Sequence, residues 1–146
     1  MATFLYDKGR KHFCFGDIVW KNAGGSTIKL TLLDNGYTPA QATHEYMNLD
    51  TILAAAKVGS PATLVLVDAA DGGVIDATDP VFSGLSGDQV VGVAIWKDGG
   101  GGGTTQSGTT DLLIAYIDNF TGFPFTPSGA DYTLQFDNGA NKIAKI

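Results

Sequence analysis

The side chains best suited to catalysis are four aspartates that lie close together in the sequence, Asp68, Asp71, Asp76 and Asp79. Two such carboxylates can act as acid and base in cleavage of a glycosidic bond. Several can hold Ca²⁺ through their oxygens, although the spacing here is not that of an EF-hand loop. Aspartates between apolar runs are also common as solvated turn residues. Solvated turn residues are the leading interpretation; a cation site and a small glycan hydrolase that uses Asp76 or Asp79 are the alternatives.

Histidine and cysteine residues are too few for a metal site of familiar pattern. His44-Glu45 begins the motif of a zinc protease, but the second histidine of that motif is replaced by Asn48. His12 and Cys14 lie close together and supply only two ligands. We therefore predict no bound metal.

A glycine run, Gly99–Gly103, invites comparison with phosphate-binding loops. Such a loop needs a Gly-Lys-Ser/Thr sequence that opens a helix. Here Thr104 follows the glycines without a lysine. The run predicts a flexible connection, and we predict no cofactor, no catalytic residue and no enzymatic activity.

Aromatic residues concentrate in the segment Phe120–Pro127, which reads Phe-Thr-Gly-Phe-Pro-Phe-Thr-Pro. Its prolines make it stiff, extended and poor in hydrogen-bond donors. It is either a loop packed over the core or an arm that inserts into a neighbouring subunit. Because an exposed apolar segment of this size marks an interface, we name Phe120, Phe123, Pro124 and Phe125 as candidate contact residues.

The two tryptophans, Trp20 and Trp96, have two interpretations. Each is either a core residue or a platform on which a sugar ring stacks. The sequence does not decide between them.

Charge is unevenly distributed along the chain, whose net charge is −6. Residues 1–30 hold five of the nine basic groups, Lys8, Arg10, Lys11, Lys21 and Lys29. We predict that residues 1–25 form a basic segment that docks on a neighbour through Lys8, Arg10 and Lys11; a solvated face without a partner is the alternative. The acidic remainder repels nucleic acid and anionic membranes, so we predict neither as a partner.

Length and composition predict one folded domain over residues 1–146. A hydrophobic fraction of 44% and a charged fraction of 16% exclude general disorder. The 20 glycines favour a turn-rich sandwich or barrel. The single Cys14 cannot form an internal disulfide, the chain has no apolar run long enough to span a membrane, and its first residues do not resemble a signal peptide.

Two apolar runs predict central strands covered on both faces, Val90–Trp96 and Leu112–Ile117, and we expect them to be antiparallel neighbours. Thr27–Leu33 alternates between apolar and polar residues, which predicts a half-buried strand. Asp71-Gly72-Gly73 predicts a hairpin turn. Further strands are predicted at Leu64–Val67, Val74–Ala77, Pro80–Phe82, Tyr132–Phe136 and Lys142–Ile146.

These elements predict an all-β domain, mainly antiparallel, built as a β-sandwich or a jelly-roll-like barrel. Minor helices are predicted near the N-terminus, at about residues 4–14, and around residues 40–57.

Four blocks occur in an order that resembles a family of small bacteriophage virion structural proteins. They are Ile28–Pro39 together with His44, then Val93–Lys97, Leu112–Asp118 and Tyr132–Gly139. The chain departs from that pattern at Leu64–Asp79, Gly99–Gly103 and Phe120–Pro127.

The resemblance implies a capsid decoration, or cement, protein that binds the major capsid protein on the outer surface of the virion after synthesis in the host cytoplasm. It implies self-association as a dimer or trimer at a local symmetry axis. Two alternatives stay open: a component of the tail, and a carbohydrate-binding module on the virion surface that uses Trp20 or Trp96.

Overall fold

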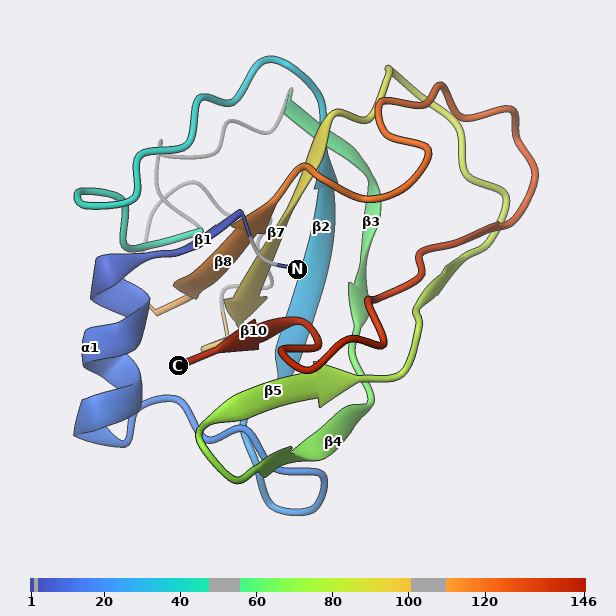
Figure 1. Ribbon diagram of the computed structural model, residues 1–146. Coiled ribbons are helices and arrows are strands. Elements are labelled where there is room, and N and C mark those ends of the chain that lie inside the picture. Colours follow the sequence, from blue (N-terminus) through green and yellow to red (C-terminus); the bar gives the residue numbers. More distant parts are fainter. Residues whose placement is uncertain (2, 48–55, 101–109) are drawn as a thin grey trace.

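The main element of the computed structural model is a five-stranded sheet with the order β1-β8-β7-β2-β3 (Figure 1). The structure describes residues 1, 3–47, 56–100 and 110–146. Neighbouring strands in this sheet are all antiparallel. The strands are β1 (Phe4–Leu5), β2 (Ile28–Leu33), β3 (Lys57–Thr63), β7 (Gly92–Lys97) and β8 (Leu112–Ile117).

Two smaller sheets cover one face of the main sheet. The first has the order β10-β5-β4, and the second pairs β6 with β9. Figure 1 shows the first of these in front of the lower end of the main sheet. The strands are β4 (Leu66–Ala70), β5 (Val74–Ala77), β6 (Val81–Phe82), β9 (Tyr132–Thr133) and β10 (Ala144–Lys145). The prediction of an antiparallel all-β domain is therefore confirmed as a sandwich-like packing of sheets, and the described residues form no closed barrel.

The strands β2, β7 and β8 are buried on both faces. On one face Leu30 and Leu32 of β2 lie opposite Ile95 and Val93 of β7, and all four join the larger hydrophobic cluster. Side chains of the opposite face, Leu33, Trp96 and Leu113 among them, form a second cluster. The prediction of covered central strands is confirmed for β7 and β8.

The prediction of a half-buried strand at Thr27–Leu33 is wrong in one respect. Its alternation does separate two faces, but both faces are covered. Thr31 is 1% exposed, and its hydroxyl accepts a hydrogen bond of 2.9 Å from Nε1 of Trp96 on β7. A threonine can occupy a buried position when a neighbour satisfies its hydroxyl.

Strand β3 begins at Lys57, the last residue of the predicted helix, and the sequence analysis predicted no element over the rest of it. Leu30 and Leu32 pair with Ala62 and Val58, so the intervening residues of β3 bulge away from the ladder. Gly59 in this bulge has φ of +68°, and Pro61 follows it. Proline and left-handed glycine obscure a strand in the sequence, and both are tolerated in a bulge on an edge strand.

The predicted helix around residues 40–57 is not found in its described part. Residues 41–43 form a turn, Tyr46 makes an isolated bridge with Leu112, and Lys57 already belongs to β3. Residues 48–55 of this prediction lie outside the described residues.

The other turn and strand predictions hold with shifted ends. The turn at Asp71-Gly72-Gly73 joins β4 to β5 as predicted. Strand β4 begins at Leu66 rather than Leu64, and β10 occupies part of Lys142–Ile146. The predicted strand Tyr132–Phe136 is a strand only at Tyr132–Thr133, although Leu134 and Phe136 point into the core as their spacing requires.

The N-terminal segment is built into the domain rather than free of it. β1 pairs with β8, and helix α1 (Asp7–Phe15) follows it directly, which confirms the predicted N-terminal helix. Gly16 ends the helix with φ of 82°, and its N–H bonds to carbonyls of the last turn. Figure 1 shows α1 beside β1 and β8.

A chain of hydrogen bonds crosses the second cluster. The N–H of Ala40 donates to Nδ1 of His44 at 3.3 Å, so this nitrogen carries no proton and also accepts from the Tyr37 hydroxyl at 2.8 Å. The Tyr37 hydroxyl in turn lies 2.7 Å from that of Tyr6, which is left as the donor. Burial lowers the pKa of His44, raises that of Tyr37 to about 12 and raises that of Tyr6 further.

We predict that Gly9→Ala destabilises the protein, although alanine normally favours a helix. A Cβ at Gly9 would lie 2.5 Å from the carbonyl oxygen of Leu113 on β8, so α1 would have to move off the sheet. We expect a loss of about 1–3 kcal/mol in the free energy of unfolding, measured in urea. Cys14→Ala on the exposed side of the same helix is the control and should change it by less than about 0.5 kcal/mol. A gain in stability for Gly9→Ala would contradict this packing.

We also predict that the Tyr6–Tyr37 pair is energetically coupled. Tyr37→Phe removes the acceptor of the buried Tyr6 hydroxyl and should cost about 1–3 kcal/mol. Adding Tyr6→Phe removes the stranded hydroxyl, so the double variant should lose less than the sum of the two single variants. Equilibrium unfolding of all four proteins in this cycle measures the coupling, and strictly additive losses would exclude it.

Candidate functional site

The structure separates the two sets of predicted contact residues. Lys8, Arg10 and Lys11 lie on α1, whereas Phe120, Phe123, Pro124 and Phe125 lie in the connection that follows β8. Figure 1 places these segments on opposite sides of the molecule. A single flat contact surface therefore cannot include both sets of residues.

The phenylalanine segment packs on its own chain. Phe120 is 5% exposed and belongs to the main core. Phe125 exchanges two backbone hydrogen bonds with Val90, of 2.8 and 3.1 Å, and its ring stacks on Tyr132 at 4.1 Å. Phe123 lies between, with ring centroids 5.1 Å from Phe120 and 5.3 Å from Phe125. Of the two interpretations, the structure has the packed loop, in which Pro124 alone of the four candidates is exposed.

Both tryptophans are core residues rather than platforms. Trp96 is 0% exposed and Trp20 is 7% exposed. Their indole N–H groups donate within the chain, to Thr31 Oγ1 and to the carbonyl of Asp76, each at 2.9 Å. The interpretation of Trp20 or Trp96 as a sugar platform is therefore wrong.

The aspartates fix connections in three different places. Asp68 accepts from the N–H of Asn22 at 2.7 Å, and Asp79 accepts from the N–H of Phe136 at 2.8 Å. Asp76 accepts from the N–H of Ala77 at 2.9 Å. Among the described residues, no three His, Cys, Asp or Glu side chains group in a way that could hold a metal ion.

Helix α1 is held in place by an ionic cluster at its C-terminal end. Nδ1 of His12 lies 2.7 Å from Asp17, and Nε2 lies 2.8 Å from Glu45. Lys11 also reaches Glu45, at 3.1 Å. Burial alone would raise the pKa of Glu45, but the hydrogen bonds from His12 and Lys11 hold it below its ordinary value. The cluster ties the helix to the turn that precedes Tyr46.

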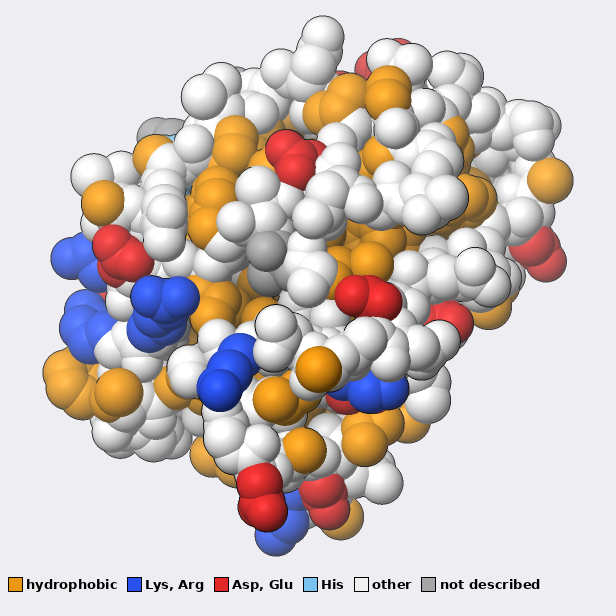
Figure 2. Space-filling view, in the orientation of Figure 1, with side chains coloured by type: hydrophobic (Ala, Val, Ile, Leu, Met, Phe, Trp, Pro, Cys, Tyr) orange, Lys and Arg blue, Asp and Glu red, His pale blue; other side chains and the backbone are white. Residues whose placement is uncertain are grey.

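A basic groove runs between α1, β1 and β10. Arg10 and Lys145 line it, with Gln41, Asn141 and Thr3 as further polar groups, and its volume is about 330 Å³. None of the described residues that line the groove carries a carboxylate. Figure 2 shows Lys and Arg side chains gathered on this side of the molecule.

An apolar side chain accompanies the charges. Phe15, at the end of α1, is 68% exposed, and Val19 beyond it is 43% exposed. In the part of the chain that the structure describes, Lys8 and Arg10 make no ion pair. We call Lys8, Arg10, Lys11, Phe15 and Lys145 the α1 surface. The charges of Lys8, Arg10 and Lys145 and the exposed ring of Phe15 are available to a partner, whereas Lys11 is already paired with Glu45.

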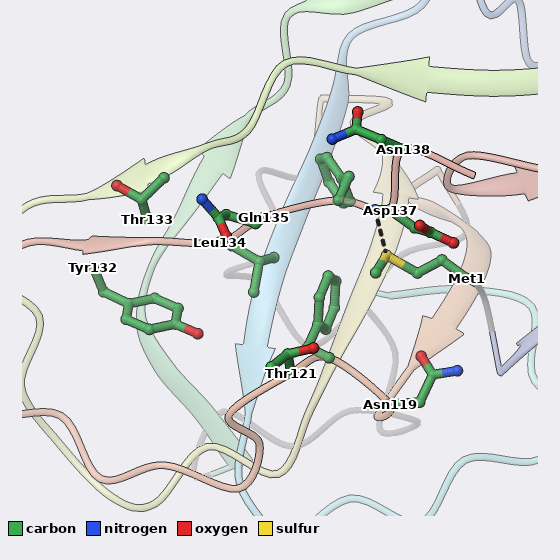
Figure 3. Close-up of a pocket in the computed structure, with 11 residues that line it drawn as sticks. Met1, Asn119, Thr121, Tyr132, Thr133, Leu134, Gln135, Asp137 and Asn138 are labelled. Carbon is green, nitrogen blue, oxygen red and sulfur yellow. Dashed lines mark hydrogen bonds between the residues drawn. The ribbon is translucent and has the colours of Figure 1, made fainter.

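A second hollow borders the basic groove, because Met1 lines both of them (Figure 3). Its volume is about 570 Å³, and it is lined from residues 119–121 and 132–138, with Met1 at one side. The sequence analysis missed it. Its polar side chains are mainly amides and hydroxyls, and these residues form no recognisable sequence motif. The only available signals were the outward positions Thr133 and Gln135, which alternate with buried neighbours.

Comparisons of this chain with protein-family models, with curated proteins and with solved structures find no match. The likeness to phage virion proteins therefore stays a prediction. Among the described residues, no helix is long and apolar enough to cross a membrane.

We predict that Glu45 stabilises the fold at pH values above its ordinary pKa of 4.5, and that this stabilisation is lost at acid pH. The folded pKa is the lower one, so the unfolded chain binds the proton more tightly and stability falls as pH drops through the folded value. Glu45→Gln should therefore unfold at a lower temperature than the unaltered protein at pH 7, and the two should converge as pH falls below 4.5.

Thermal unfolding followed by circular dichroism at a series of pH values measures this difference. Asp88→Asn, at an exposed position, is the control for loss of one carboxylate and should track the unaltered protein throughout. A difference for Glu45→Gln that stays constant into acid would show that the carboxylate charge is not what holds the helix.

Proposed function

We propose that this protein is a non-enzymatic virion component of the capsid decoration type. It docks on the major capsid protein at the outer surface of a phage head and stabilises the shell. The α1 surface makes the contact. The virion setting rests on the ordered resemblance of four sequence blocks, and the choice of contact surface rests on the structure.

The observation that carries the docking surface is a basic, aromatic-bearing face on an acidic body. The chain has 15 acidic and 9 basic residues, yet Arg10 and Lys145 line one groove, and Lys8 and Lys11 lie on the helix that borders it. Complementary charge steers association and fixes the register of a contact, while an exposed ring such as Phe15 supplies an apolar anchor. A partner with an acidic patch fits this surface.

The α1 surface is held rigid before binding. Gly9 lets the helix lie against β8, and His12 ties its last turn to Asp17 and Glu45. Binding through a surface that is already ordered loses less conformational entropy than binding through a free arm. This supports contact through a helix that is packed on the domain, within the basic segment predicted for residues 1–25.

A small rigid domain suits the role of a cement. Each copy that binds the assembled shell and not its separated subunits shifts the equilibrium toward the shell, and the effect is repeated over every equivalent site. Closed symmetry favours dimers or trimers at local axes, and we propose self-association of this kind on the head. No part of this role requires a reaction.

We predict that Arg10→Glu weakens binding to heads at least about tenfold, because it places a carboxylate in the basic groove. The measurement is co-sedimentation with phage heads that lack this protein. They are prepared from a mutant of the phage that encodes it, in which its gene is deleted. Lys21→Glu makes the same change of charge in an exposed loop and is the matched control, with unchanged binding expected. Raising the salt concentration should weaken the binding of the unaltered protein to heads toward that of Arg10→Glu.

Cryo-electron microscopy of particles that carry the protein tests the location. Density on the outer shell at junctions between capsomers, with α1 toward the shell, is the expected result. Density only at the tail, no density on any particle, or equal binding by Arg10→Glu and Lys21→Glu would overturn the proposal.

A further inference from the structure

The second hollow has the form of a binding site for a small polar ligand. Residues 119–121 and 132–138 frame it, and Figure 3 shows their side chains around a shared space. The volume of about 570 Å³ falls within the range of about 300–1,000 Å³ that is usual for small-molecule sites. The hollow is therefore large enough for a ligand of one to a few rings.

The polar groups around the hollow have no partner of their own. In the described part of the chain, the side chains of Asn119, Thr121, Thr133, Gln135 and Asn138 make no hydrogen bond. An amide offers two donors and an acceptor with two lone pairs, and a hydroxyl offers both functions. The rim thus presents donors and acceptors side by side, which suits a ligand with neighbouring hydroxyl groups.

The floor of the hollow is apolar and rigid. Leu134 is 0% exposed, Phe120 5% and Phe136 6%. Tyr132, at one end of the hollow, is partly exposed. Its ring is held in place by stacking on Phe125. An apolar floor below a polar rim matches a sugar, which has C–H groups on its ring faces and hydroxyls at its edge.

The charge of the lining selects against acidic ligands. Asp137 is the one charged side chain among the described residues that line the hollow, and its Oδ1 accepts a hydrogen bond of 3.0 Å from the N–H of Gly139. A phosphate, sulfate or carboxylate would meet this carboxylate, and none of the described residues that line the hollow is a lysine, arginine or histidine. The ligand class that fits is neutral.

An extended peptide fits less well than a sugar. Peptides that join a sheet take their affinity from free main-chain groups of an edge. In the lining segment, the N–H of Leu134 already donates to the Pro80 carbonyl, and that of Phe136 to Asp79. These two N–H groups are therefore not open to a peptide strand.

We propose that the hollow formed by residues 119–121 and 132–138 binds a neutral saccharide, with the amides of Asn119, Gln135 and Asn138 on its hydroxyl groups. The residues of this site are not those of the α1 surface, although Met1 lines both the hollow and the basic groove. The proposed site includes neither Trp20 nor Trp96, because both are buried.

The test is a glycan array with neutral and acidic glycans, followed by NMR titration of the purified protein with the methyl glycosides of the terminal sugars that bind. The paired variant Gln135→Ala/Asn138→Ala removes two exposed amides and should keep the fold, which its thermal unfolding checks. It should lower the affinity at least about tenfold. Asn35→Ala, at an exposed turn outside the hollow, is the matched control and should bind as the unaltered protein does.

Binding of a neutral glycan that the paired variant loses and the control keeps would establish the site. Three results would overturn the proposal: no neutral glycan bound at millimolar concentration, binding of acidic glycans alone, or equal affinity of the paired variant and the control.

Discussion

Burial of β2, β7 and β8 on both faces is the constraint on which the rest of the structure depends. A sheet whose central strands are apolar on both sides needs two coverings, and the chain supplies them from different segments. The smaller sheets and the C-terminal connections cover one face and enclose the larger cluster. The segment after β2 brings Tyr37 and Met47 to the other face. Polar atoms in these interiors are paired, and the described residues contain no buried side-chain polar atom without a hydrogen bond.

The position of the α1 surface follows from the edge of this sheet. Strand β8 would present an open edge, and unpaired edges invite association with other chains. The short β1 pairs with part of that edge, and the helix that follows it lies close against β8 because Gly9 has no side chain. Closing the edge in this way turns the basic residues of the helix outward. The same arrangement that protects the sheet thus displays positive charge on an acidic domain.

Some features of the site were predictable and others were not. The basic character of residues 8–11 and the apolar character of Phe120–Pro127 are visible in the sequence, but their exposure is not. The loop became part of the core because Val90 pairs with Phe125, a contact between segments far apart in the chain. Arg10 and Lys145 come from opposite ends of the chain and meet at one groove. No pattern of local spacing reports such a meeting.

The sequence by itself determined the class of the fold, the two central strands at Val90–Trp96 and Leu112–Ile117, the hairpin at Asp71-Gly72-Gly73 and the N-terminal helix. These depend on hydrophobic periodicity and turn chemistry, which act over a few residues. Tertiary structure decided that Gly59 and Pro61 lie in a strand, that Thr31 is buried, and where the two hollows lie. Each of these depends on which distant segments pack together, because long-range contacts override local preference wherever they bury more apolar surface or pair more polar groups.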